Sequence, residues 1–204
     1  MTIRTHVGDL PDLDRYGAVV AVDTETLGLQ PHRDRLCVVQ LSPGDGSADV
    51  VQIRKGQREA PNLVRLLSDP DRVKIFHYAR FDLAVLFQTF GVTVAPVFCT
   101  KIASKLTRTY TDRHGLKDVT RELLGIEISK QQQSSDWGAA ELTQAQLDYA
   151  ASDVLNLHAL RERLTVLLER EDRAGFADAC FRFLPTRARL DLLGWGEEDI
   201  FAHT

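Results

Sequence analysis

The segment Ala18–Glu25 constrains the fold of this chain more than any other stretch, and it reads Ala-Val-Val-Ala-Val-Asp-Thr-Glu. Its five apolar residues, rich in valine, predict a short strand that is buried on both faces. The strand ends on two carboxylates, Asp23 and Glu25. Because residues i and i+2 of an extended segment point to the same side, we expect both carboxylates to face one site at the strand's end.

Two carboxylates that share a site repel each other. The repulsion is about 4 kcal/mol for a pair about 4 Å apart at an effective dielectric constant of about 20. A hard divalent cation, which prefers oxygen ligands, would compensate this charge. An acidic pair at a strand end is, however, more often a solvated turn. A metal site therefore requires further ligands elsewhere in the chain.

Length and charge narrow the class of protein. The 204 residues, of which 44% are hydrophobic and 26% charged, suffice for one α/β domain with a sizeable core. Neither an internal repeat nor a flexible linker divides residues 1–204, so we expect a single domain. The net charge of −4 argues against a basic face that tracks long nucleic acid, but it permits a short oligonucleotide as a ligand.

The cysteines and the apolar runs indicate the cellular compartment in which the protein works. Cys37, Cys99 and Cys180 are far apart and odd in number, so they form neither a zinc pattern nor a disulfide framework. The first ten residues lack the basic and apolar run of a signal peptide, and no apolar stretch approaches membrane-spanning length. We therefore expect a reduced, cytoplasmic protein that does not contact a membrane.

The apolar runs predict a five-stranded sheet. Leu36–Leu41 and Asp49–Ile53 are joined by turn residues, so the first three strands should form an antiparallel meander. Val73–Phe76 predicts the fourth strand and Val92–Phe98 the fifth. Residues 1–17 are polar, and we expect a short edge strand and a turn or helix there.

Helical spacing occupies most of the remaining chain. We expect helices at residues 61–67, 81–90, 100–106 and 116–123, the second and fourth closed by Gly91 and Gly125. Thr143 with Gln146 three residues later is a capping-box pattern, which predicts the start of a long helix that runs to Leu168. A further helix begins near Phe176 and is expected to break near Pro185.

Two further acidic residues fall on these helices. Asp82 opens the helix after the fourth strand, and if that strand lies beside the first, Asp82 comes close to the carboxyl-end site. Complementing the helix dipole is the alternative role for Asp82. Asp153 lies four residues after Tyr149, so the two share one helix face. The alternative is a partly exposed Asp153 beside a tyrosine at the core edge.

The order of these motifs resembles the DEDD superfamily of 3′→5′ exonucleases, in the branch with a tyrosine in its third motif. Within it the chain resembles the ribonuclease D group and, most closely, the compact NrnC-type nanoRNases. The stretches that carry the resemblance are Asp23-Thr-Glu25, His77-Tyr-Ala-Arg-Phe-Asp82-Leu, Gly115-Leu-Lys-Asp, Lys130-Gln-Gln-Gln133-Ser-Ser-Asp-Trp137, Tyr149-Ala-Ala-Ser-Asp153-Val and the C-terminal Leu-Gly-Trp-Gly-Glu-Glu-Asp-Ile-Phe-Ala-His.

The resemblance implies a ribonuclease H-like α/β fold, a mixed sheet flanked by helices, and two divalent cations, Mg²⁺ or Mn²⁺. Asp23, Glu25 and Asp153 would hold the ion that activates water, and Asp23 would bridge to a second ion near Asp82. Tyr149 would orient the attacking water, because a phenol of pKa about 10 is a poor base.

The resemblance also implies a set of substrate contacts: Thr24, Thr26, Leu29, His77, Lys130 and Gln133. Leu29 would wedge between the last two bases, or else fold back onto the core as a loop residue. His77 would contact substrate or satisfy a hydrogen bond at the strand's end, and Lys130 is otherwise a solvated lysine. The basic group Arg108, Arg113, His114 and Lys117 either holds a 5′-phosphate or forms a solvated face, and Trp137 is expected in the core.

Two departures from the family pattern bear on the substrate. Tyr78 stands where the family often has asparagine, which leaves the substrate contacts there open. The chain also has no room for the helical RNA-binding domains of larger ribonuclease D proteins, which favours short substrates.

The expected activity is metal-dependent 3′→5′ hydrolysis of short oligoribonucleotides, down to dinucleotides, to nucleoside 5′-monophosphates. A broader nuclease that trims structured RNA or single-stranded DNA is the alternative, and a non-catalytic nucleic-acid-binding module a further one. Residues 172–204 are rich in large apolar side chains, which predicts a C-terminal helical tail that serves a homo-oligomer, in the NrnC resemblance a ring of eight.

Overall fold

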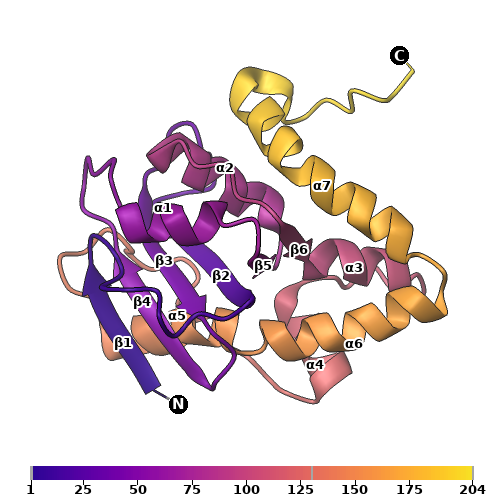
Figure 1. Cartoon of the computed structure of the whole chain (residues 1–204), viewed down its shortest axis with the longest axis horizontal. Coiled ribbons are helices and arrows are strands. Elements are labelled where there is room, and N and C mark those ends of the chain that lie inside the picture. The colour runs from indigo at the N-terminus through magenta and orange to yellow at the C-terminus, as the bar shows by residue number, and fades with distance from the viewer. Residues whose placement is uncertain (1, 130, 204) are drawn as a thin grey trace.

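The computed structural model describes residues 2–129 and 131–203, and its centre is a six-stranded mixed sheet with the order β1-β4-β3-β2-β5-β6 (Figure 1). The strands are β1 Thr2–Val7, β2 Val19–Thr26, β3 Leu36–Ser42, β4 Ser47–Gln52, β5 Val73–Phe76 and β6 Val97–Cys99. The expected meander is confirmed, because β2 pairs antiparallel with β3 and β3 with β4. Strand β5 runs parallel to β2, which brings the segment before Asp82 beside the end of β2.

The sheet has six strands where five were expected, because the short edge strand expected within residues 1–17 is present as β1 and joins the sheet. Strand β1 pairs in parallel with β4 from Thr2 opposite Ser47 to Val7 opposite Gln52. Its residues are mostly exposed, so this edge strand lacks the buried apolar run that marks the central strands. Strand β6 is shorter than predicted and begins after Pro96, whose ring nitrogen has no hydrogen to donate to a sheet.

Seven helices are present in the described part of the chain: α1 Pro61–Ser68, α2 Ala79–Phe90, α3 Thr100–Thr107, α4 Leu116–Leu124, α5 Gln144–Leu155, α6 Leu157–Arg170 and α7 Ala174–Leu190. A short π turn, η1 Asp191–Trp195, follows. Gly91 and Gly125 close α2 and α4 in the left-handed conformation, as expected. The capping box at Thr143 and Gln146 is also present.

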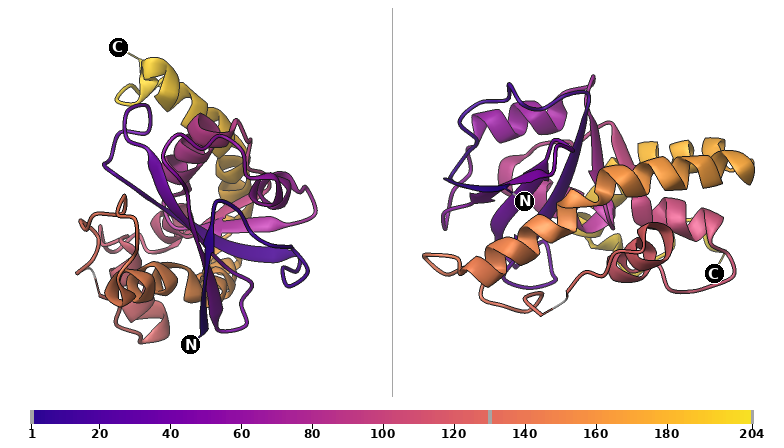
Figure 2. Two further views of the ribbon diagram at one scale, coloured as in Figure 1. Left: turned by 90° about the vertical axis from the view of Figure 1, so that its left-hand side faces the viewer. Right: turned by 90° about the horizontal axis from the view of Figure 1, so that it is seen from below.

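Two helix predictions are wrong. The long helix expected from residue 144 to 168 is interrupted at Asn156, which separates α5 from α6. The bend allows α5 to stay on the sheet while α6 turns away to pack on α3 and α4 (Figure 2). Helix α7 continues through Pro185 instead of breaking there. Phe181, Leu184 and Ala188 are buried on its inner face, and this packing outweighs the hydrogen bond that proline removes.

The sheet lies between two helical layers. Val39 and Val51, on one face, belong to the main core together with the buried leucines of α1. Val38 and Val50, on the other face, pack with Trp137 and with Ala150 of α5. The active residues expected on α5 therefore approach β2 from the face opposite α1. No helix in the described ranges combines the length and the apolar character needed to span a bilayer.

Candidate active site

A cleft of about 650 Å³ lies at the end of β2, between α5, the start of α2 and the start of α3. Ten of the eleven predicted site residues line it: Asp23, Thr24, Glu25, Thr26, Leu29, His77, Asp82, Gln133, Tyr149 and Asp153. Lys130, the eleventh, lies outside the described residues. The structure thus brings together residues that are up to 130 positions apart in the sequence.

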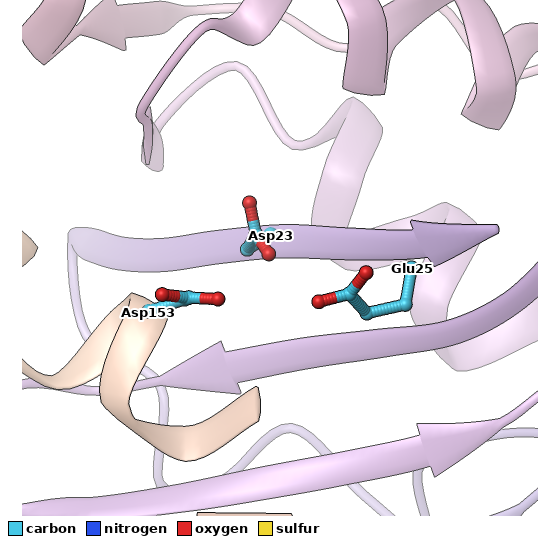
Figure 3. Close-up of side chains that lie close together, drawn as sticks. All are labelled: Asp23, Glu25 and Asp153. Atoms are coloured by element: carbon cyan, nitrogen blue, oxygen red, sulfur yellow. The ribbon is translucent and has the colours of Figure 1, made fainter. Parts of the chain in front are cut away.

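Three carboxylates form the floor of the cleft. Asp23 and Glu25 extend from the same side of β2, and Asp153 reaches toward them from α5 (Figure 3). One oxygen of each residue lies within 4.8 Å of the others. This geometry follows from the two spacings read in the sequence, i and i+2 on a strand and one inward face of a helix.

Asp82 approaches the same site from α2 but is not one of these three. Its Oδ1 accepts a hydrogen bond of 2.6 Å from the hydroxyl of Thr24, the residue between Asp23 and Glu25. Burial and the charge of Asp23 both raise the pKa of Asp82 well above its ordinary value. Asp82 is therefore close enough to Asp23 to interact with it electrostatically, while its side chain is anchored on Thr24.

Burial disfavours the ionised form of each carboxyl group, and the charge of Asp23 adds to this effect in the other three. Burial raises the pKa of Asp23 to about 7, and burial with the charges of Asp23, Asp153 and Asp82 raises the pKa of Glu25 to about 10. The pKa of Asp153 is also raised, first by burial and then by Asp23. None of the ion pairs among the described residues involves these four side chains.

This donor set fits a hard divalent cation. All of the converging ligands are oxygens, and their negative charge is not compensated by an ion pair in the described ranges. Mg²⁺ and Mn²⁺ are held in proteins by such carboxylates. A cation bound there would lower the pKa values of the carboxyl groups and stabilise their ionised forms.

Tyr149 stands one helical turn before Asp153. Its ring centroid lies 6.0 Å from that of the buried Trp137, which fixes the tyrosine at the cleft wall. Burial, and next the charge of Asp153, raise the pKa of Tyr149 above its ordinary value. The hydroxyl therefore stays protonated, which suits a hydrogen-bond donor and not a general base.

Residues 8–169 match the family whose description is 3′-5′ exonuclease. The chain belongs to that family. Ribonuclease D of Gluconacetobacter diazotrophicus is 38% identical to this exonuclease over 154 residues, which are 76% of this chain and 39% of that protein. The exonuclease thus spans about two fifths of the length of this curated relative.

Two solved structures resemble the exonuclease over the whole of both chains. Brucella melitensis NrnC with bound Mg²⁺ has 66% identity and a TM-score of 0.97. Brucella melitensis NrnC bound to pGG has 67% identity and a TM-score of 0.98. The expected ribonuclease H-like fold and the resemblance to ribonuclease D-like DEDD exonucleases are confirmed.

The residues predicted to contact substrate, and Trp137, differ in their exposure and in their hydrogen bonds. Leu29 is 85% exposed at the cleft, so the alternative in which it folds onto the core is wrong. His77 makes the hydrogen bond expected at the strand's end, with 2.9 Å between its Nδ1 and Thr100 Oγ1. The Thr26 hydroxyl donates to the carbonyl of Gly28, which shapes the loop before Leu29. Trp137 is buried, as expected.

The basic group does not act as one unit. Arg108 is only 1% exposed, and its guanidinium donates to Glu122, Ser104 and the carbonyl of Arg113. It is therefore neither a solvated residue nor available to a 5′-phosphate. Of the four residues in that group, Lys117 lines the cleft.

Gln40, which supports Asp23 from β3, and two lining residues of the cleft, Tyr78 and Lys101, were not among the predicted site residues. Gln40 is fully buried on β3 opposite Asp23, and its Nε2 donates to Asp23 Oδ2 at 3.0 Å. Tyr78 and Lys101 line the cleft and contact each other. A polar residue inside the otherwise apolar run Leu36–Leu41 was the available signal for Gln40, whereas the Tyr78–Lys101 contact depends on tertiary structure alone.

Proposed function

We propose that this exonuclease hydrolyses short oligoribonucleotides, down to dinucleotides, from the 3′ end to nucleoside 5′-monophosphates with the help of two divalent cations. The observation that carries the proposal is the convergence of Asp23, Glu25 and Asp153, with Asp82 beside them, in one cleft. The cleft volume of about 650 Å³ falls in the range of small-ligand sites. Similarity to the pGG-bound NrnC over the full length of both chains supports a short substrate.

In this proposal Asp23, Glu25 and Asp153 hold one cation, and Asp23 with Asp82 holds the second. When bound, such ions acidify water and stabilise negative charge on the phosphate during in-line displacement. The Mg²⁺ in the related NrnC supports the choice of metal. Gln40 holds the Asp23 carboxylate in place through its amide, and Thr24 does the same for Asp82.

The remaining cleft residues act on the substrate. The protonated Tyr149 hydroxyl donates a hydrogen bond that orients the attacking water. Leu29, exposed on the loop after β2, inserts between the last two bases. Thr24, Thr26, His77, Lys130 and Gln133 contact the sugar, base or phosphate groups. Trimming of structured RNA is the second candidate, because the chain is similar to ribonuclease D proteins, two of them at 38% and 35% identity, and the solved Escherichia coli ribonuclease D is described as processing structured RNA.

Time courses with three 5′-labelled RNAs test this function: a dinucleotide, a heptamer and a hairpin, each with Mg²⁺. We expect the dinucleotide to be converted to mononucleotide at least as fast as the heptamer is shortened, and the hairpin stem to persist. Dinucleotides that accumulate while the hairpin is trimmed would instead support the ribonuclease D-like activity. Parallel reactions with the matching DNA measure the sugar preference.

We propose further that residues 1–204 act as a single exonuclease domain in a cytoplasmic homo-oligomer, in which residues 172–204 form the interface. Several large apolar side chains of this tail are exposed: Phe176, Leu193, Trp195, Ile200 and Phe201. The alternative, packing onto the chain's own core, accounts for Phe181 and Leu184, which are buried. Light scattering of the intact protein should give the mass of an oligomer, and a ring of eight is the expected size. A monomeric mass would refute the interface.

A further inference from the structure

The connection that carries Leu29 is closed by a hydrogen bond at its base. Residues 27–35, called the Leu29 loop below, join β2 to β3. Leu27, Gly28 and Leu29 of this loop line the cleft. The backbone amide of Leu27 donates to the carbonyl of Arg35 at 3.2 Å, so the two ends of the loop are bonded to each other. This closure fixes where the loop begins and ends, but it does not by itself orient Leu29.

One carboxylate organises the backbone beside Leu29. The Oδ2 atom of Asp34 accepts a hydrogen bond of 3.0 Å from the backbone amide of Gln30, the residue after Leu29. The Arg33 guanidinium donates to both oxygens of the same carboxylate, at 2.7 and 2.9 Å. The carbonyl of Gln30 accepts a further hydrogen bond of 2.7 Å from the Asp34 amide. Both backbone groups of Gln30 are therefore bonded to Asp34.

The Asp34 carboxylate also packs against the residue before Leu29. A Cβ atom on Gly28 would lie 2.2 Å from Asp34 Oδ2, closer than two non-bonded atoms can approach. A glycine is thus required at this position because the carboxylate lies against its Cα atom. Only 11% of the Asp34 side chain is exposed, and Asp34 is not among the described residues that line the cleft. It can therefore act on a substrate only through its neighbours in the loop.

The base of the Leu29 loop is joined to a second segment of the cleft wall. The Arg35 guanidinium donates to the carbonyl of Gly138 at 3.3 Å. A Cβ atom on Gly138 would lie 2.8 Å from Leu27 Cδ2 and 3.0 Å from Arg35 Nη2, so the two segments are in close contact. Gly138 follows the stretch in which Gln133 lines the cleft. The loop thus has a fixed base, and Leu29 projects from it with 85% of its surface exposed.

An exposed leucine contributes most to binding when its backbone is already in place. A mobile loop would have to be ordered at the moment the substrate binds, and this ordering would cost affinity. If only a fraction of the molecules hold the loop in the binding position, the apparent dissociation constant rises by the inverse of that fraction. Anchors on both sides of Leu29 remove this cost before the substrate arrives.

We propose that Asp34 is a positioning residue for substrate binding, whose carboxylate holds the backbone on both sides of Leu29 so that this side chain projects into the cleft in advance. The inference rests on the proposed function, in which Leu29 inserts between the last two bases. Asp34 then sets the affinity for two adjacent bases without contacting either of them. The competing account is a purely structural role, in which loss of Asp34 lowers stability and nothing else.

Two substrates separate these accounts: pGG and an analogue of it whose 5′ nucleotide lacks the base. Asp34→Ala should raise KM for pGG about fivefold, the effect of a binding-competent fraction of about one fifth, with kcat within about twofold of wild type. KM for the abasic analogue should equal that of wild type, because no side chain can insert between two bases there. Asp34→Asn keeps an oxygen for the Gln30 amide and should hold KM for pGG within about twofold of wild type.

A double variant and a matched control complete the kinetics. Asp34→Ala combined with Leu29→Ala should have the KM of Leu29→Ala alone, because Asp34 acts through Leu29. In the control, Asp45→Ala, the lost carboxylate likewise accepts a hydrogen bond from a backbone amide, that of Ser47, in a loop between strands. Asp45→Ala should keep the wild-type KM for both substrates. A wild-type KM for pGG in Asp34→Ala, or an equal rise for both substrates, would overturn the positioning role.

Hydrogen exchange tests the anchoring without an activity assay. Asp34→Ala should speed exchange of the amides in residues 27–34 about tenfold or more, whereas Asp45→Ala should affect only the amides around Ser47. Unchanged exchange in the Leu29 loop would contradict the inference. A wild-type enzyme with equal KM for pGG and the abasic analogue would refute insertion of Leu29, and the inference with it. If wild type cleaves no dinucleotide, the proposed function fails, while hydrogen exchange still decides whether Asp34 anchors the loop.

Discussion

At the residue scale, the site consists of four carboxyl groups whose pKa values are raised by burial, and the charge of Asp23 raises those of Glu25, Asp82 and Asp153 further. Asp23 and Glu25 are held on the same side of β2 by the alternation of the strand, and Asp153 is aimed at them by the inward face of α5. Such an arrangement is unfavourable in the metal-free protein, and its persistence in the fold is the physical argument for a cation.

The raised pKa values predict how metal-free stability depends on pH. The pKa of Asp23 rises from its ordinary value near 4 to about 7 and that of Glu25 to about 10, chiefly through burial. The folded state therefore binds more protons than the unfolded state between these values, so stability falls as pH rises from about 4 toward 10. Mg²⁺ binds the ionised form, so it should raise Tm more at pH 8.5 than at pH 5.5.

Melting curves in EDTA and in Mg²⁺ at the two pH values measure this difference. We expect the Mg²⁺-induced rise in Tm to be larger at pH 8.5 by at least about 2–4 °C, the shift that 1 kcal/mol produces in a chain of this length. Asp23→Asn should reduce the difference, whereas Asp148→Asn, on the exposed side of α5, should not. Equal rises at both pH values would contradict the account.

Site residues could be predicted from the sequence where the two partners lie within one strand or one helix. Asp23 with Glu25, and Tyr149 with Asp153, could be paired from the sequence, because each pair lies within one element. Asp82 required the added assumption that β5 lies beside β2. Gln40 and Lys101 were not predicted, because each meets its partner across elements, on β3 and α3, and no local spacing encodes such a contact.

At the element scale, a buried arginine shapes the segment that enters the cleft at Gly115. Arg108 follows α3, and its guanidinium is bound by Glu122 of α4 and by the carbonyl of Arg113. The Tyr110 hydroxyl donates to the same carboxylate. Hydrogen bonds from Arg108, and next from Tyr110, lower the pKa of Glu122 to about 2. These contacts join the ends of α3 and α4 and fix the loop between them.

Glu122→Gln should destabilise the protein at pH 7 by about 1–3 kcal/mol, because it leaves the Arg108 guanidinium buried without a counter-charge. The lowered pKa of Glu122 means that this stabilisation is present above about pH 4.5 and is lost as pH falls toward 2. Urea unfolding at pH 7 and pH 3 should thus show a smaller difference between wild type and variant at pH 3. Glu141→Gln, at an exposed position without such a partner, is the control. An equal difference in unfolding free energy between wild type and variant at both pH values would refute this role of the Arg108–Glu122 ion pair.

Helix ends were predictable where the local residues determine them. Gly91, Gly125 and the Thr143–Gln146 box each mark a boundary by their own chemistry. The two wrong predictions err in opposite directions. The chain bends at Asn156, where a continuous helix was expected, and it stays helical through Pro185, where a break was expected. Tertiary packing decides both. The long apolar spacing through Leu168 is compatible with one helix or with two.

At the scale of the whole molecule, the meander and the parallel β5 place the ends of β2 and β5 and the helices α2 and α5 around one cleft. The meander followed from the order of strands and turns in the sequence, whereas the position of β5 beside β2 was an added assumption. A short edge strand was expected within residues 1–17, but it was left out of the five-stranded sheet because its exposed residues lack a hydrophobic pattern. Arg80, two residues before Asp82, pairs with Asp191, so the segment after α7 is anchored beside α2.

The central claim is that the carboxylate cluster carries out metal-dependent cleavage of a short oligonucleotide. The most direct measurement compares kcat/KM on a 5′-phosphorylated dinucleotide with Mg²⁺ for wild type, Asp23→Asn and the control Asp148→Asn. We predict that Asp23→Asn lowers kcat/KM by about 10³-fold or more, the size expected for a lost electrostatic group, while it melts in EDTA no lower than wild type. Asp148→Asn should retain wild-type activity. Full activity in Asp23→Asn, or in wild type with EDTA, would contradict the account.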